Sequence, residues 1–281
     1  MHDPGPATPR LWPKPILVLG TDDIASAVGH ALARIGVPVL LVRDPEVPVL
    51  RRGMAFDDAL EDGSARIDGL TAYAADPAAP ARATEILAIT DLPPDGLMDP
   101  ALVAGVIDAR LRRVRCRPDL RGSLPFAIGL GPGFIAGGNV DMAVETAPEA
   151  PGLILRQGTT RAAPAESGLL VGPEGQQLVR APRSGLWWTF REIGENLQAG
   201  DVGGLCAGRQ IPFPLAGRMC GLVRRGTVVR AGMCLLEVDP RGEDAHCHGI
   251  SPLAATIAAA TVTAVHELWR TSRQETSQWL S

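Results

Sequence analysis

The chain has 281 residues, 46% of them apolar and 21% charged, which is enough apolar material for one large domain or two ordinary ones. Its net charge of -4 gives no reason to expect nucleic acid or an anionic membrane surface as a partner. The single lysine, Lys14, excludes a P-loop lysine, a Schiff-base lysine or a lipoyl or biotinyl lysine anywhere after the leader.

The leader, residues 1–14, has no signal-peptide pattern and is expected to be flexible, and no apolar run in the chain is long enough to span a bilayer. The cysteines form no Cys-x-x-Cys pair and one is left over, which is typical of a reducing compartment: Cys116, Cys206, Cys220, Cys234 and Cys247. We therefore expect a cytoplasmic protein without a disulfide framework.

An α/β domain is predicted over residues 15–148. The apolar run 16–20 predicts a buried strand, Ile24 to Ile35 a helix that ends at Gly36, and 37–44 a second strand. This βαβ unit favours a Rossmann-like fold, with further strands expected at 85–90, 102–108 and 125–131.

Residues 149–250 are rich in Gly and Pro and predict a β-rich domain. It contains an internal repeat over 178–240, with landmarks at a constant offset of 32 residues: Pro182 and Pro214, Gly185 and Gly217, Gly194 and Gly226, Gly200 and Gly232. The repeat resembles the barrel-sandwich hybrid of biotinyl and lipoyl domains. Because its connection 207–212 has no lysine, we expect neither lipoate nor biotin.

The last segment, 251–281, predicts a C-terminal helix and a polar tail. Ser251 suits the N-cap and Pro252 the first turn, and an apolar face continues to about residue 269.

The turn after the first strand, GTDDIASA, resembles a dinucleotide-binding loop in which Asp22 and Ala27 replace glycines. Gly20 suits the tight turn, but a carboxylate at Asp22 opposes a phosphate at the helix N-terminus. Either Asp22 and Asp23 cap the helix, or the turn contacts a ribose or pterin group, or it still holds a dinucleotide. Asp44, at the end of the second strand, is either a ribose-binding carboxylate or a solvated strand end.

A phosphate site is predicted from a glycine loop and an arginine run. The loop 128–139 offers Gly129, Gly131 and Gly133, whose backbone amides suit an anion nest, although an irregular turn is the alternative. Six arginines lie between Arg110 and Arg121, either as a solvated surface or as a clamp that faces the loop. Arg51 and Arg52 are expected to join that clamp.

The sequence HCH at 246–248 is the one His/Cys cluster. Neighbouring strand residues point to opposite faces and a structural site usually needs four ligands, so we assign no metal site. Cys247 is expected to be a buried thiol or a thiolate. No catalytic constellation can be assigned from spacing.

Motifs along nearly the whole chain resemble the YqeB group of selenium-dependent molybdenum hydroxylase accessory proteins, relatives of the XdhC/CoxI maturation factors. They are LGTDDIASAVGHALARIG, RRGMAFDDALEDG, VIDAR, AIGLGPGFIAGGNVDMAVET, VRAPRSG, GLVRRGTVVRAG, EVDPRG and CHGIS. The resemblance implies a maturation factor that transiently binds molybdenum cofactor, as molybdopterin or its dinucleotide form, and assists its insertion into a molybdenum hydroxylase of the xanthine or carbon monoxide dehydrogenase type.

We therefore expect a cofactor-handling accessory protein rather than an enzyme, with a molybdenum hydroxylase subunit as its partner and a homo-oligomer left open. The cofactor-binding residues are expected to be Gly20, Asp22, Asp23, Asp44, Arg51, Arg52, Arg110, Gly129, Gly131 and Gly133. The β-rich half is expected to dock the target enzyme or shield the cofactor. The alternatives are an NAD(P)-dependent oxidoreductase and an interaction scaffold with a vestigial nucleotide crevice.

Overall fold

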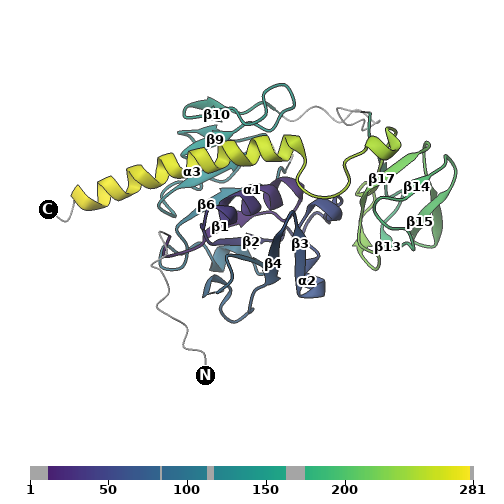
Figure 1. The fold of residues 1–281 in the computed structure, drawn as a ribbon, viewed down its shortest axis with the longest axis horizontal. Coiled ribbons are helices and arrows are strands. Elements are labelled where there is room, and N and C mark those ends of the chain that lie inside the picture. Colours follow the sequence, from purple (N-terminus) through teal and green to yellow (C-terminus); the bar gives the residue numbers. More distant parts are fainter. Residues whose placement is uncertain (1–11, 83, 113–116, 163–174, 279–281) are drawn as a thin grey trace.

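The computed structural model describes residues 12–82, 84–112, 117–162 and 175–278. An α/β part is built on a nine-stranded sheet, and a smaller β part lies beside it (Figure 1). Most of the predicted leader and three members of the arginine and cysteine sets, Arg113, Arg115 and Cys116, lie outside the described residues.

The large sheet has the order β10-β9-β7-β6-β1-β2-β5-β4-β3. Neighbouring strands are parallel except at the edges, where β3 and β10 run antiparallel to β4 and β9. Its central strands are buried apolar runs, as expected of a sheet covered on both faces. The strands are β1 Ile16–Leu19, β2 Val39–Val42, β3 Ser64–Ile67, β4 Leu70–Ala74, β5 Leu87–Thr90, β6 Gly105–Asp108, β7 Ala127–Leu130, β9 Met142–Val144 and β10 Ile154–Leu155.

Helices cover one face of this sheet. The predicted crossover helix is confirmed as α1 (Asp23–Arg34), and α3 (Pro252–Gln278) from the end of the chain packs along it (Figure 1). Loops cover the other face, where Phe134 and Leu97 join the core. Besides the short α2 (Ala59–Asp62), the described connections after β2 hold no α-helix, because proline and glycine interrupt stretches such as DLPPDG.

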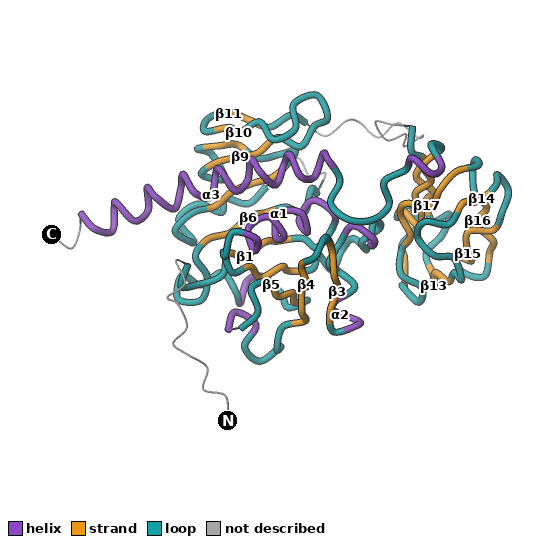
Figure 2. Tube along the Cα trace, viewed as in Figure 1, coloured by secondary structure: helices purple, strands orange, loops and turns teal. Residues whose placement is uncertain are grey.

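The β part lies to one side of the α/β part (Figure 2). It contains two four-stranded sheets, β12-β19-β17-β14 and β16-β15-β13-β18. The predicted repeat is confirmed, because each strand of the first half has a counterpart 32 residues later: β12 Gln177–Arg180 and β16 Arg209–Pro212, β13 Gly185–Trp188 and β17 Gly217–Leu222, β14 Asn196–Leu197 and β18 Val228–Val229, β15 Val202–Cys206 and β19 Cys234–Asp239. If each strand is replaced by its counterpart in the other half of the repeat, the order β12-β19-β17-β14 becomes β16-β15-β13-β18. The β part therefore has an internal pseudo-twofold symmetry.

The boundaries differ somewhat from those expected. β10 extends the large sheet beyond residue 148, and a small sheet joins β8 (Ile135–Ala136) to β11 (Gly158–Thr159). Ser251 caps α3, since its Oγ accepts a hydrogen bond from the N–H of Ala254, but the helix continues past residue 269. Within the described residues, no helix is both long and apolar enough to cross a membrane.

Candidate functional site

The winding of the sheet reverses between β1 and β6, and the carboxyl ends of these parallel strands form a crevice at that switch point. The turn after β1 begins at Gly20, whose φ of 116° lies in the region that favours glycine. A Cβ on Gly20 would lie 3.2 Å from the backbone of Ala109, which follows β6. The two strand ends approach closely because residue 20 has no side chain.

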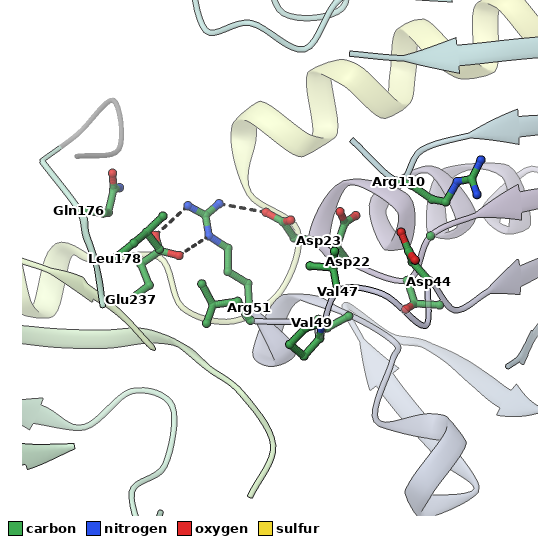
Figure 3. Close-up of a pocket in the computed structure, with 14 residues that line it drawn as sticks. Asp22, Asp23, Asp44, Val47, Val49, Arg51, Arg110, Gln176, Leu178 and Glu237 are labelled. Carbon is green, nitrogen blue, oxygen red and sulfur yellow. Dashed lines mark hydrogen bonds and ion pairs between the residues drawn. The ribbon is translucent and has the colours of Figure 1, made fainter. Parts of the chain in front are cut away.

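A cavity of about 300 Å³ opens at this switch point, between the α/β part and the β part (Figure 3). The structure brings together six of the predicted residues in its lining: Gly20, Asp22, Asp23, Asp44, Arg51 and Arg110. The β part adds Gln176, Leu178 and Glu237, which sequence reasoning missed. The EVDPRG motif, which begins at Glu237, was the one signal that could have found any of them.

Asp22 caps α1, since its Oδ1 accepts a hydrogen bond of 2.9 Å from the backbone N–H of Ala25. The capping interpretation is confirmed for Asp22, whereas Asp23 lies in the first turn and binds Arg51. Burial and the adjacent negative charge of Asp23 raise the pKa of Asp22 to about 7. A carboxyl group that lines the cavity can therefore either donate or accept a hydrogen bond near neutral pH.

Arg51 joins the two parts of the molecule across this cavity (Figure 3). Its Nε and Nη2 each donate a 2.8 Å hydrogen bond to Glu237 on β19, and its Nη1 donates one of 3.0 Å to Asp23 on α1. Burial opposes the charge of Arg51, but the hydrogen bonds and negative charges of Glu237 and Asp23 together outweigh it and raise the pKa of the guanidinium. Arg51 was expected in a phosphate clamp, and the structure instead engages it between two carboxylates.

The arginines after β6 form ion pairs at the strand ends. Arg110 donates from Nε and Nη2 to the fully buried Asp108, while its Nη1 makes no hydrogen bond within the part of the chain that the structure describes. Arg112 forms a bidentate pair with Asp44, in which Nε donates to Oδ2 and Nη2 to Oδ1. Burial would raise the pKa of Asp44, but the bonds from Arg112 and the backbone N–H of Glu46, together with the nearby guanidinium charges, outweigh it and lower that pKa. Asp44 is therefore not the solvated strand end that one interpretation expected.

A groove of about 700 Å³ adjoins the cavity and shares Val47, Pro48, Arg110 and Leu178 with it. Glu46 is the one acidic residue in its described lining, against four arginines: Arg110, Arg112, Arg180 and Arg230. The side chain of Arg230 forms no ion pair within residues 12–82, 84–112, 117–162 and 175–278. The interdomain cleft thus has a carboxylate end at the switch point and a guanidinium end in the groove.

The glycine loop lies outside both the cavity and the groove, so the structure does not bring Gly129, Gly131 and Gly133 together with the other predicted site residues. The buried ring of Phe134 fills the space beside Gly129, where a Cβ would overlap it. The N–H of Gly131 is donated to the carbonyl of Val144 at 3.0 Å. This corrects the expected geometry. The loop closes a strand pairing and packs a ring, and Arg117 and Arg121 of the arginine run donate to its backbone carbonyls at Pro132 and Gly137.

The remaining basic residues of the predicted clamp also have internal partners. Arg52 binds Asp58 and lines a second cavity of about 240 Å³, which adjoins the first through the segment from Asp44 to Val49. Arg117, a member of the arginine run, lies with its guanidinium 4.5 Å from the centre of the Phe134 ring. Arg121 binds Asp119. The described arginines of the run are therefore not a wholly solvated surface, and those that reach the glycine loop, Arg117 and Arg121, donate to its carbonyls at Pro132 and Gly137.

Cys247 is not the lone thiol expected from the sequence, because it forms a disulfide with Cys220 on β17. Both cysteines are buried, and their Cα atoms lie 4.4 Å apart. The bridge fastens the segment that leads into α3 to the β part. Within the described residues, no group of three or more His, Cys, Asp or Glu side chains could hold a metal ion.

No protein-family model matches the chain. It is 29% identical over 271 residues to the uncharacterized protein YqeB of Escherichia coli K12, an alignment that covers 94% of this chain and 50% of the relative. The two are homologous, and the chain spans about half the length of the relative. Among solved structures, a succinylglutamate desuccinylase/aspartoacylase from Rhodobacter sphaeroides is 15% identical, with a TM-score of 0.25 over 80% of this chain and 86% of that chain. So loose a superposition supports no inference about fold or activity.

Proposed function

We propose that this chain binds molybdenum cofactor, as molybdopterin or its dinucleotide form, in the interdomain cleft and assists its insertion into a molybdenum hydroxylase of the xanthine or carbon monoxide dehydrogenase type. The motif resemblance and the homology to YqeB motivate the proposal, although that relative is itself uncharacterized. The observation that carries it is the cleft itself, with carboxylates at one end and arginines at the other.

The residues present fit such a cargo in one orientation. The phosphate groups suit the groove, where Arg230 and the remaining donor of Arg110 are available for charge-assisted hydrogen bonds. The pterin or nucleoside groups suit the switch-point cavity, where Asp22 and the other carboxylates accept from ring N–H and hydroxyl groups. Volumes of about 300 and 700 Å³ fall in the range of known small-molecule sites.

This proposal treats the α/β part as Rossmann-like and the β part as a barrel-sandwich hybrid. The strand order β5-β2-β1-β6-β7-β9, with its switch point between β1 and β6, supports the first assignment. The two symmetry-related sheets support the second. In this proposal the cofactor is cargo, and the chain's own residues only bind, orient and shield it before a hydroxylase subunit receives it.

Calorimetric titration with molybdopterin dinucleotide tests the proposal, with NADH as a second titrant. Wild-type protein is expected to bind the molybdopterin dinucleotide saturably, and Arg230→Glu to bind it about tenfold more weakly or worse. Arg225→Glu is the matched control, because Arg225 is exposed but lines neither the cavity nor the groove. Binding of NADH alone would favour the oxidoreductase, and binding of neither would favour the scaffold.

A further inference from the structure

One sheet of the β part has an apolar outer face. Its exposed side chains include Trp188 at 40%, Phe190 at 80% and Val228 at 77%. The outer strip is formed by six side chains, Leu186, Trp188, Phe190, Val202, Leu205 and Val228, from β13, β15, β18 and the residues that follow β13. These strands belong to the sheet β16-β15-β13-β18.

The strip is continuous. Trp188 pairs with Leu205 on the neighbouring strand, and Leu186 pairs with Val228 on the other side. The rings of Trp188 and Phe190 meet edge to face, with centroids 6.1 Å apart. Scattered surface apolar residues need no explanation, but a contiguous patch that contains aromatic residues is typical of an interaction site.

The internal symmetry relates the sheet that carries the outer strip to the sheet β12-β19-β17-β14, whose equivalent face is covered. The counterpart of Trp188 is Cys220 on β17, and the counterpart of Leu205 is Glu237 on β19. Cys220 is covered through its disulfide to Cys247, and Glu237 is covered by Arg51 from the α/β part. One of two equivalent faces therefore holds a folded domain of the same chain.

We propose that the outer strip is a second docking face, which binds a second folded protein domain with an apolar contact bordered by carboxylates. The charge follows from two exposed arginines beside the strip that have no ion pair within the described residues, Arg183 and Arg225. The backbone carbonyl of Arg183 accepts a hydrogen bond from the thiol of Cys206 on β15, which places Arg183 beside the strip. Arg225 is placed there by the next residue, Gly226, whose N–H donates to the carbonyl of Trp187 on β13.

The concrete candidate for this domain lies in the E. coli relative. That protein is about twice as long as the matched region, so in it the homologous fold is continuous with as much protein again. The proposal does not rest on cofactor binding, since none of the six side chains of the strip lines the switch-point cavity or the groove.

The test uses the half of E. coli YqeB that this chain does not match, produced as a separate polypeptide and checked for cooperative unfolding. Saturable binding to the wild-type chain is expected, and Trp188→Ser/Phe190→Ser should bind roughly 30-fold more weakly. Leu153→Ser is the matched control, since Leu153 is 53% exposed on the α/β part, and it should bind as wild type does. Arg230→Glu should also leave this binding unchanged. The docking proposal can therefore fail or hold independently of the proposed cofactor site.

If that half does not unfold cooperatively, the matched region of intact YqeB is replaced by this chain, and acrylamide quenching of tryptophan fluorescence is compared in the chimera and the free chain. The part of the signal that Trp188→Phe removes should be shielded in the chimera. Equal quenching, no saturable binding, or binding unchanged by the double substitution would overturn the proposal. So would a wild-type dimer that the double substitution converts to monomer, or strip-dependent binding to phosphatidylserine vesicles without binding to the YqeB half.

Discussion

The Nη2 atom of Arg51 lies 2.8 Å from Oε1 of Glu237, although the two residues are 186 positions apart in the sequence. A guanidinium carried by the α/β part thus neutralises a carboxylate whose side chain is only 4% exposed in the β part. Arg51 also binds Asp23 beside the cavity, so this one guanidinium connects the two walls of the interdomain cleft.

Replacing Arg51 with Met is expected to lower the free energy of unfolding by about 3 kcal/mol, because it leaves the buried Glu237 without its partner. Urea denaturation measures the change. Arg66→Met, at an exposed position on β3, should change stability by no more than about 0.5 kcal/mol. The double variant Arg51→Met/Glu237→Gln should regain part of the loss, and a double variant no more stable than Arg51→Met would contradict the pairing.

The stability of the protein should fall as pH rises from about 4 to about 7, in part because of Asp22. Its pKa is raised from 3.8 to about 7, so in this interval the folded state holds a proton that the unfolded chain has released. Asn preserves the helix cap but does not titrate, so Asp22→Asn should flatten the pH dependence. Urea titrations at pH 5, 6, 7 and 8 measure it, and an identical slope in the variant would show that Asp22 is not the group responsible.

Gly129→Ala should destabilise the fold by about 1–3 kcal/mol, because the added methyl group would overlap the buried ring of Phe134. Gly96→Ala is the control, since a Cβ there meets nothing within 4 Å. Thermal denaturation compares the two. Equal unfolding temperatures would mean that the glycine is not required for packing.

Removal of the disulfide through Cys247→Ser should cost about 2–4 kcal/mol of stability, because the bridge closes a sequence separation of 27 residues. Cys206→Ser, at a cysteine that forms no disulfide among the described residues, should cost less, because a hydroxyl can also donate to the carbonyl of Arg183 that its thiol reaches. Denaturation under non-reducing conditions measures both. An excess reductant should lower the stability of wild type but leave Cys247→Ser unchanged, and the opposite pattern would refute a stabilising bridge.

Local patterns predicted the parts of the fold that depend on periodicity and capping. The apolar run before Gly20, the cap at Asp22 and the offset between Gly185 and Gly217 all reappear as β1, α1 and the symmetric strand pairs. These features are encoded within short windows or by repetition. The first-loop residues and Asp44 also fall on the cavity, because the carboxyl ends of parallel strands share one edge.

Partners distant in sequence could not be predicted in the same way. Nothing near Arg112 indicates that Asp44 engages it rather than a ligand, and nothing near Cys247 indicates Cys220. The glycines of the 128–139 loop suit an anion nest or a ring-packing turn equally well, and only the neighbouring Phe134 decides between them. The residues that the β part contributes to the cleft depend on how the two parts pack against each other. No short stretch of the sequence contains that information.

Hydrogen–deuterium exchange, measured with and without molybdopterin dinucleotide, tests the cleft assignment most directly. Bound ligand should slow exchange in segments that line the cavity and groove and leave the glycine loop, 129–133, unchanged. The segments expected to be protected are 20–23, 44–51, 110–112, 176–180 and 230–234. Protection centred on 129–133, or no protection at saturating ligand, would contradict the account.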